Sequence, residues 1–351
     1  LPCEECQPLF YQGLPKSSRY LTYSLIMFTY QTKVYLPFIT PISSIINAMT
    51  PSHKLSGVYA AAVTPLQADG APDQLAIPQL VNFLANRGCH GLLVLGTTGE
   101  GPSFSPAERS QILESTTQAR QSYPALRLLA GTGTPSLDET ISLTRLAFDL
   151  GFEGVVVLPP YYYRKVSVQG LFTWFDTLLS KAVPSDGTLL GYHIPPITGI
   201  GFSLDLLSRL KDAHPRSFAG IKDSSGDSEF AQQLGHRFGA DLFVLTGNDR
   251  LFSLALENHA SGCITAMANI YSPLLRQAWD AFQRGSSIQT MQDLLTNLRN
   301  ILDLYPPMPP LLKGLLHRLN NLPCWPVRAP LVSFPDTKIQ EVIDSLAALS
   351  S

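Results

Sequence analysis

Charged residues are scarce in this sequence, and its net charge is small. Only 15% of its 351 residues are Asp, Glu, Lys or Arg, and the formal net charge is −2. Proteins that bind nucleic acid need clustered positive charge to neutralise the phosphate backbone, so we expect no nucleic-acid partner. Hydrophobic residues make up 45% of the chain, which is typical of a folded globular protein and argues against a disordered one.

Cysteine is also rare. The chain has five, namely Cys3, Cys6, Cys89, Cys263 and Cys324, and an odd, scattered set of this kind argues against a disulfide framework and for a reducing compartment. Cys3 and Cys6 form a single CxxC, but a zinc site normally needs a second pair of ligands. No other cluster of His, Cys and acidic residues has metal-ligand spacing, so we expect no metal and no other cofactor.

Long apolar runs are missing as well. A membrane-spanning helix needs about 18 uninterrupted apolar residues, and no stretch of this chain reaches that length, so we expect no membrane partner. Residues 1–54 differ from the rest, since they are rich in Ser, Thr, Tyr and Pro and contain only two acids. They are either an organelle-targeting segment or an extension upstream of a start at Met49. We therefore expect a cytoplasmic protein, with an organelle as the alternative.

What the chain does contain, from Leu55 onward, is a series of short apolar segments, each followed by a helix-like segment. Eight of them recur at intervals of about 20 to 36 residues, which suits a strand, a helix and two loops. Continuous apolar runs are typical of parallel strands covered on both faces. The pattern predicts an α/β fold, a (β/α)8 barrel, with an open doubly wound sheet as the alternative. The segments are GVYAAAVTP (57–65), GLLVLGTTGE (91–100), RLLAGTGT (127–134), GVVVLPPYYY (154–163), LLGYHIPPITG (189–199), FAGIKDSSGD (218–227), LFVLTGNDR (242–250) and GCITAMAN (262–269).

Helix signals lie between and after these segments. Ser105, Pro106 and Glu108 form a capping-box pattern at the start of SPAERSQILES. Beyond Asn269 the alternation stops, and apolar residues at three- and four-residue spacing predict further helices, including a capped final one in FPDTKIQEVIDSLAAL (334–349). We therefore divide the chain into an N-terminal extension (1–54), a barrel (55–284) and a C-terminal helical region (285–351).

Reactive side chains of such a barrel lie at the C-terminal ends of the strands, where the loops surround a shared mouth. Lys222 directly follows the apolar FAGI, where an ammonium is expensive unless it is paired or used in chemistry. It is either a nucleophile that forms a Schiff base with a carbonyl substrate or a structural lysine paired with an aspartate. The candidate partners are Asp223, Asp227 and Asp249.

Tyr192 and the loop GTTGEG (96–101) lie at two other strand ends. Tyr192 is either a proton carrier for a Schiff-base enzyme or a core residue. The glycine-rich loop lacks the GxxxxGK[ST] and GxGxxG spacings of nucleotide sites, but its backbone N–H groups and hydroxyls could hold a small carboxylate, such as that of a 2-oxo acid. No GxSxG occurs, so serine-nucleophile hydrolysis has little support.

Four motifs together closely resemble the dihydrodipicolinate synthase/N-acetylneuraminate lyase family of class I aldolases. They are GTTGE (96–100), PYY (160–162), YHIPPITG (192–199) and GIKDSSGD (220–227), and the likeness extends from about Leu55 to PVRAPL (326–331). The resemblance implies a (β/α)8 barrel with a C-terminal helical portion, and a covalent imine in place of a cofactor.

The resemblance also implies roles for individual residues. Lys222 matches the lysine that forms an imine with pyruvate or another 2-oxo acid, and Tyr192 matches the tyrosine that moves protons. Thr97 matches the threonine that links this tyrosine to a second tyrosine, and Tyr162 matches that second tyrosine. In bacterial synthases that second tyrosine reaches into the neighbouring subunit's site, so a homodimer or homotetramer is implied. The expected substrate contacts are Gly96 and Thr98 at the carboxylate, with Gly247 and Ile264 along the pocket wall.

The turn after Tyr192 departs from the family pattern. Synthases of the family usually carry arginine where this chain has Ile197, and an alkyl group cannot replace a guanidinium that grips a carboxylate.

Neuraminate lyases usually place an acid after the aspartate matched by Asp249, whereas this chain has Arg250. That arginine either binds an anionic distal group of the substrate or faces solvent.

We therefore expect a Schiff-base-forming carbon–carbon lyase that acts on pyruvate or on a hydroxylated 2-oxo acid. Substrates of the type of 4-hydroxy-2-oxoglutarate or a 2-keto-3-deoxy sugar acid fit this expectation. One alternative is dihydrodipicolinate synthesis from pyruvate and aspartate semialdehyde. Another, of a different class, is a non-catalytic barrel that only binds a 2-oxo acid.

Overall fold

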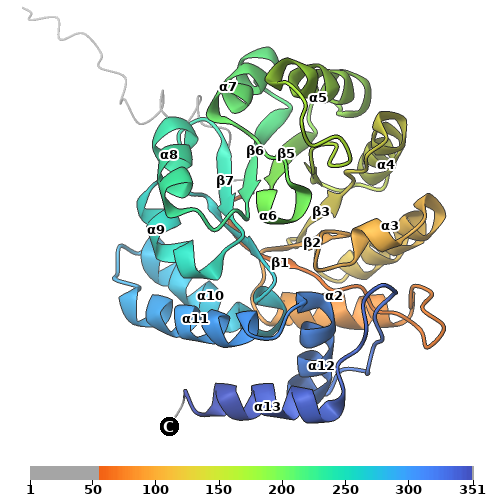
Figure 1. Ribbon diagram of the computed structural model, residues 1–351, viewed down its shortest axis with the longest axis vertical. Coiled ribbons are helices and arrows are strands. Elements are labelled where there is room, and N and C mark those ends of the chain that lie inside the picture. The colour runs from red at the N-terminus through yellow and green to blue at the C-terminus, as the bar shows by residue number, and fades with distance from the viewer. Residues whose placement is uncertain (1–54, 350–351) are drawn as a thin grey trace, which may run out of the picture. The chain divides into compact units, whose positions relative to one another are not determined.

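Eight parallel strands form a closed barrel in the computed structural model, which describes residues 55–349 (Figure 1). Each strand pairs with the next, and the first pairs with the last. The predicted barrel is confirmed, and the alternative of an open sheet is wrong. Each strand overlaps one of the eight apolar segments, and the bounds are β1 (Gly57–Ala61), β2 (Gly91–Val94), β3 (Arg127–Gly131), β4 (Gly154–Val157), β5 (Thr188–His193), β6 (Phe218–Asp223), β7 (Phe243–Thr246) and β8 (Gly262–Thr265).

The continuous apolar runs of the strands reflect burial on both faces. In β2, Leu93 belongs to the cluster that fills the barrel, together with Leu129 of β3 and Leu245 of β7. Its neighbour Leu92 belongs instead to the larger cluster between the strands and the surrounding helices. Successive side chains of a strand point to opposite faces, so both faces of the barrel wall need apolar residues.

Helices surround the barrel and connect successive strands (Figure 1). The capping box is confirmed, because Ser105 accepts from the backbone of Glu108 while the Glu108 carboxylate accepts from the backbone of Ser105. Three short elements, η2 (Gly101–Ser103), α6 (Pro195–Thr198) and η3 (Asp249–Leu251), follow β2, β5 and β7. The longer ones are α2 (Ala76–Asn86), α3 (Pro106–Arg120), α4 (Leu137–Asp149), α5 (Val168–Ala182), α7 (Leu204–Ala213), α8 (Ser228–Phe238), α9 (Phe252–Glu257) and α10 (Ala268–Gln283).

Three further helices form the C-terminal region: α11 (Gln289–Asp303), α12 (Met308–Asn320) and α13 (Asp336–Ala347). The boundary that we place after residue 284 falls in the connection between α10 and α11. The final helix is present but not capped as expected, because its N-cap position is Pro335 and no side chain caps it. Residues 322–335 join α12 to α13 without helix or strand, and we call them the connecting segment.

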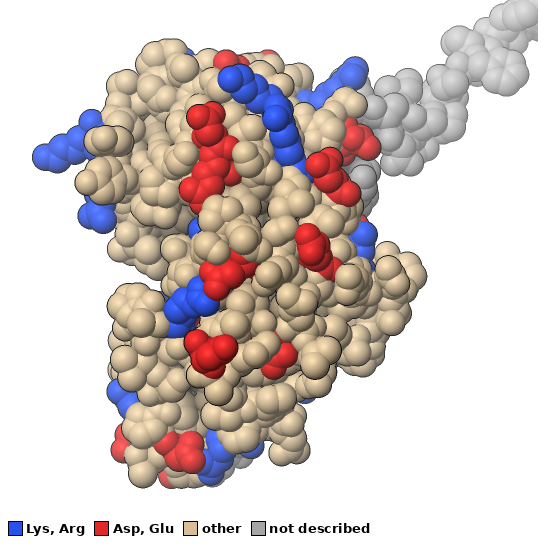
Figure 2. Space-filling view, turned by 90° about the vertical axis from the view of Figure 1, so that its right-hand side faces the viewer, with Lys and Arg blue, Asp and Glu red and all other residues tan. Residues whose placement is uncertain are grey.

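The surface carries charges of both signs. On the face shown in Figure 2, groups of acidic and of basic side chains are scattered among a larger area of uncharged residues. Within residues 55–349, no helix has the length and hydrophobicity needed to cross a membrane. The CxxC of Cys3 and Cys6 lies outside the described residues.

Candidate active site

Lys222 and Tyr192 are paired across two neighbouring strands. Each is the last residue but one of its strand, β6 and β5, and the two are partners in the strand register. The Lys222 Nζ atom lies 4.0 Å from the centroid of the Tyr192 ring. Lys222 is 3% exposed and Tyr192 4%, so the register places an amine and a phenol together in a buried site at the mouth of the barrel.

The aspartates that could neutralise Lys222 have other partners. Asp249 forms an ion pair with Arg299, and Asp227 caps α8. Asp223 accepts a hydrogen bond from the backbone N–H of Ser225. Lys222 forms no ion pair with any residue of the range 55–349. The structural reading, a lysine held by one of these carboxylates, is therefore wrong.

The hydroxyl of Tyr192 lies in a polar cluster. Its oxygen is 3.3 Å from Oγ1 of Thr97. Burial by itself raises the pKa of Tyr192, but the positive charge of Lys222 and hydrogen bonds from neighbouring side chains outweigh burial, so the pKa lies below the ordinary value of tyrosine. These neighbours are Thr97, Lys222 and Ser224. A phenol that loses its proton more readily is better suited to proton transfer near neutral pH.

Ser224 is a site residue that the sequence reasoning missed. It follows Lys222 by two positions in KDSSGD, at the same strand end, and this position was the available signal. A Cβ atom at Gly247 would lie only 2.0 Å from Oγ of Ser224. Because glycine at 247 has no Cβ atom, the hydroxyl of Ser224 can occupy this space.

The loop after β2 brings Gly96, Thr97 and Thr98 to the same mouth. Gly96 and Thr97 line a narrow cavity together with Tyr192, and Thr98 is buried. Ile264 of β8 belongs to the cluster that fills the barrel, as does Tyr192. Gly96, Thr97 and Ile264 thus lie near Tyr192, and the roles of these residues and of Thr98 toward a substrate stay predictions.

Ile197 and Tyr162 lie further out. Ile197 is 58% exposed in α6, and Tyr162 is 75% exposed in the loop after β4. The ring of Tyr162 meets that of Tyr163 edge to face, with centroids 5.2 Å apart. The predicted link of Tyr162 to Thr97 involves the site of a neighbouring subunit, so it stays a prediction.

Asp249 and Arg250 are both engaged by α11. The buried carboxylate of Asp249 accepts from Thr265 at 2.5 Å and from Arg299 at 3.0 Å. Arg250 forms an ion pair with Asp303 at 2.9 Å and also donates to Asn300. Contact between Arg250 and a distal group of the substrate stays a prediction.

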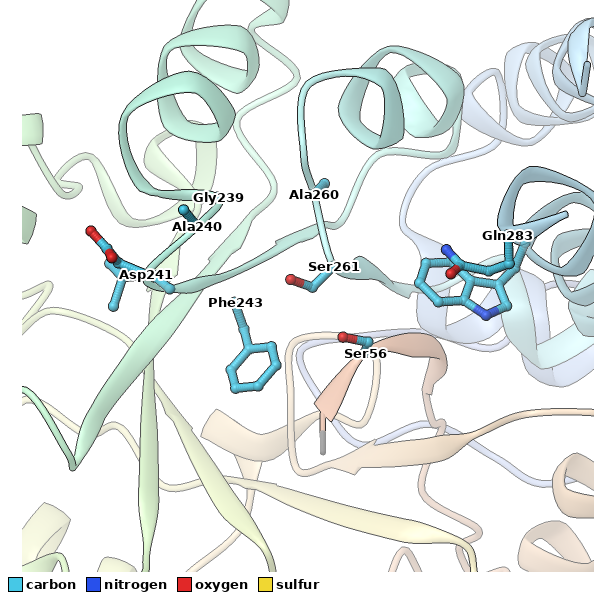
Figure 3. A pocket seen from close by; sticks show the side chains of 10 residues that line it. Ser56, Gly239, Ala240, Asp241, Phe243, Ala260, Ser261 and Gln283 are labelled. Carbon is cyan, nitrogen blue, oxygen red and sulfur yellow. The ribbon is translucent and has the colours of Figure 1, made fainter. Parts of the chain in front are cut away.

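A second pocket, larger than the one beside Tyr192, lies at the opposite end of the barrel, and Figure 3 shows the side chains that line it. Its lining includes Phe243, the first residue of β7, together with Ser56 and Ser261, which precede β1 and β8. The beginnings of parallel strands meet at the end of the barrel away from Lys222. This pocket is therefore separate from the candidate site. Within residues 55–349, no group of three or more His, Cys, Asp or Glu residues could hold a metal ion.

Comparison with known proteins identifies the family. Residues 54–349 match the Dihydrodipicolinate synthetase family. The chain belongs to this family. It is 38% identical over 286 residues to an uncharacterized DapA-like lyase of Chloroflexus aurantiacus, covering 81% of this chain and 93% of that protein. It is 30% identical over 300 residues to the 4-hydroxy-tetrahydrodipicolinate synthase of Prochlorococcus marinus, covering 82% of this chain and 93% of the relative.

A solved structure of the family is also similar. The chloride-inhibited dihydrodipicolinate synthase from Acinetobacter baumannii, complexed with pyruvate, has a TM-score of 0.76 and 27% identity, and the match covers 84% of this chain and 99% of that one. The family resemblance drawn from the four motifs is thus confirmed. This member of the dihydrodipicolinate synthetase family is an aldolase-type lyase.

Proposed function

We propose that this lyase forms an imine between Lys222 and the ketone of pyruvate or of a hydroxylated 2-oxo acid. One observation carries the proposal: a buried amine that has no carboxylate partner among residues 55–349 lies 4.0 Å from the ring of a buried tyrosine. An unpaired ammonium is costly in such a place. A role as a covalent nucleophile accounts for its being there.

The proposed chemistry uses the imine as an electron sink. The amine of Lys222 adds to the ketone carbon, water leaves, and the protonated imine accepts the electron pair of the carbon–carbon bond as that bond breaks. An enamine and an aldehyde result. Protonation of the enamine and hydrolysis then release the 2-oxo acid product and the free lysine. Tyr192 carries the protons, with Thr97 and Ser224 orienting its hydroxyl. Because the imine holds the electrons, the reaction as proposed involves no cofactor.

The proposed substrate pocket is built around this pair. Thr98 and the backbone from Gly96 hold the substrate carboxylate, and Gly247 and Ile264 form its wall. Ile197 faces the distal part of the substrate and supplies no charge. We therefore propose cleavage of a hydroxylated 2-oxo acid, of the type of 4-hydroxy-2-oxoglutarate or a 2-keto-3-deoxy sugar acid. Synthesis of dihydrodipicolinate is the second candidate, favoured by the names of several relatives.

The exposed tyrosines support an oligomer. Tyr162 and Tyr163 are 75% and 71% exposed, and apolar rings of this size at a barrel mouth are typical of residues covered by a partner. We propose a homodimer or homotetramer in which Tyr162 of one subunit joins the Thr97–Tyr192 pair of the next.

A cytoplasmic location is proposed from the buried free thiols of Cys89 and Cys263.

Borohydride trapping tests the mechanism. The protein is reduced in the presence of pyruvate and digested, and the peptides are mapped by mass. A pyruvate adduct on Lys222 is expected, with none in a Lys222→Ala control. A folded, unaltered protein without that adduct would refute the mechanism. Pyruvate release from the candidate 2-oxo acids, compared with turnover of pyruvate plus aspartate semialdehyde, separates the two candidate functions.

A further inference from the structure

Glu100 is a buried carboxylate at the end of the loop that carries Thr97 and Thr98. It accepts a hydrogen bond from Nζ of Lys313 at 2.6 Å and from the backbone N–H of Arg328 at 2.8 Å. The side chains of Glu100 and Lys313 are 0% and 2% exposed. Both partners belong to the C-terminal region, more than 200 positions along the chain. The carboxylate therefore joins the C-terminal region to the loop at the barrel mouth.

The backbone of this loop is strained at both ends. Leu95 has φ +58° and Glu100 has φ +57°, a left-handed conformation that residues with a side chain rarely adopt. Such a conformation persists only when surrounding contacts hold it. The four residues between them, 96–99, include both threonines of the site.

The loop is short, so the position of Glu100 at its end affects the positions of Thr97 and Thr98. The backbone N–H of Glu100 donates to the carbonyl of Thr97, and that of Gly101 donates to the carbonyl of Gly96. Thr97 in turn lies within hydrogen-bond distance of Tyr192. A shift of Glu100 would therefore move the hydroxyl that contacts the proposed proton carrier.

The C-terminal side of the junction is held by further contacts. Lys313 of α12 also donates to the carbonyl of Pro326 at 2.6 Å. Burial lowers the pKa of Lys313, and the charge of Glu100 opposes that effect. The side chain of Arg328 forms an ion pair with Glu108 and donates to the carbonyls of Ser103 and Gly70. The connecting segment is thus held in place at Pro326 by Lys313 and at Arg328 by Glu108, Ser103 and Gly70.

We propose that Glu100, Lys313 and Arg328 position the substrate-binding loop, so that the C-terminal helical region controls binding of the 2-oxo acid without touching it. This proposal rests on the proposed function of the Lys222 site. The three are positioning residues that act through Thr97 and Thr98. A role confined to stability would lower the amount of folded protein and leave the affinity of the folded fraction for pyruvate unchanged.

The test measures how much pyruvate is needed for half-maximal borohydride trapping on Lys222. The double variant Glu100→Gln/Lys313→Met removes both buried charges together and so avoids leaving one unpaired. Loss of a fixed contact to a charged carboxylate weakens binding considerably. We expect the half-saturating pyruvate concentration to rise at least fivefold in the folded double variant. A smaller rise would overturn the positioning role.

A second variant covers the case in which the first does not fold. Arg328→Gln alters the quarter-exposed outer side of the junction and keeps its backbone N–H. A rise of at least threefold is expected, and an unchanged value would overturn the proposal. The matched control is Arg120→Met/Glu153→Gln, which removes an ion pair at the other end of the barrel and is expected to leave the half-saturating concentration unchanged.

The unaltered protein separates the two proposals. If it gives no adduct on Lys222, the proposed function has failed, and the positioning role fails with it. If it gives the adduct and the variants are half-saturated at the same pyruvate concentration as the unaltered protein, only the positioning role has failed.

Discussion

Lys222 and Tyr192 occupy matched positions on β6 and β5, and the ammonium of the lysine lies against the face of the tyrosine ring, 4.0 Å from its centroid. A cation over an aromatic face is stabilised by the ring quadrupole. In this site the same cation also lowers the pKa of the phenol against the effect of burial. We propose that this one pair of side chains supplies both the nucleophile and the proton carrier.

Tyr192→Phe is expected to separate imine formation from turnover. Phenylalanine keeps the ring that packs in the barrel and removes only the hydroxyl. Since general acid–base catalysis contributes roughly 100-fold or more, kcat for pyruvate release should fall by about that factor. Trapping of pyruvate on Lys222 at saturating concentration should persist. Steady-state kinetics and peptide mapping check this, and kcat within threefold of the unaltered protein would exclude Tyr192 as the proton carrier.

Thr97→Val should change the pH dependence of the reaction. The hydrogen bond with Thr97 lowers the pKa of Tyr192, so its removal raises that pKa. The limb of the pH–rate profile that reports Tyr192 should therefore move to higher pH. Thr97→Ser keeps the hydroxyl and serves as the control, with the profile of the unaltered protein. An identical profile for valine and serine would show that this hydrogen bond does not tune the phenol.

Ile197→Arg should favour the synthase reaction. The side chain at 197 is 58% exposed, so a longer residue fits without disturbing the core. A guanidinium there could bind the carboxylate of aspartate semialdehyde in bidentate geometry. We expect kcat/KM for that substrate to rise by about tenfold, since one charge-assisted contact is worth roughly that factor. Ile197→Met, which adds length without charge, should give no gain. Strong synthase turnover by the unaltered protein would instead contradict the inference from Ile197.

Gly247→Ala should impair the site while leaving the fold intact. The added Cβ atom would lie 2.0 Å from Oγ of Ser224, so the serine hydroxyl must move away from its contact with Tyr192. We expect kcat to fall by about fivefold, in line with the loss of a hydrogen bond of about 1 kcal/mol. Gly170→Ala in α5 is the matched control, because its new Cβ meets nothing closer than 3.5 Å. Equal kcat values for the two variants would remove Ser224 from the mechanism.

Much of the fold could be predicted because its signals are local. Each strand is a short apolar run followed by glycine, proline or small polar residues, and the start of α3 has its cap within four residues of sequence. The final helix shows the limit of such signals. Asp336 looks like part of a cap, but the helix begins at that residue and the position before it is proline.

The candidate site was predictable in part. Lys222 and Tyr192 follow from the rule that strands of a barrel deliver reactive side chains at their C-terminal ends. Asp249 and Arg250 lie at such an end too, yet α11 engages both of them. Nothing in the spacing around residue 249 indicates a partner 50 positions later. The position of the Ser224 hydroxyl likewise depends on a distant residue, because it occupies space that a Cβ atom at Gly247, directly after β7, would fill.

The sequence by itself determined which segments become strands and helices, and which polar residues lie at strand ends, because hydrophobic periodicity reports burial over a few neighbouring residues. The tertiary structure alone decided the register that pairs Tyr192 with Lys222 and the contact of Glu100 with Lys313, 213 positions apart. These features depend on which distant parts of the chain meet, and packing of the whole core decides that.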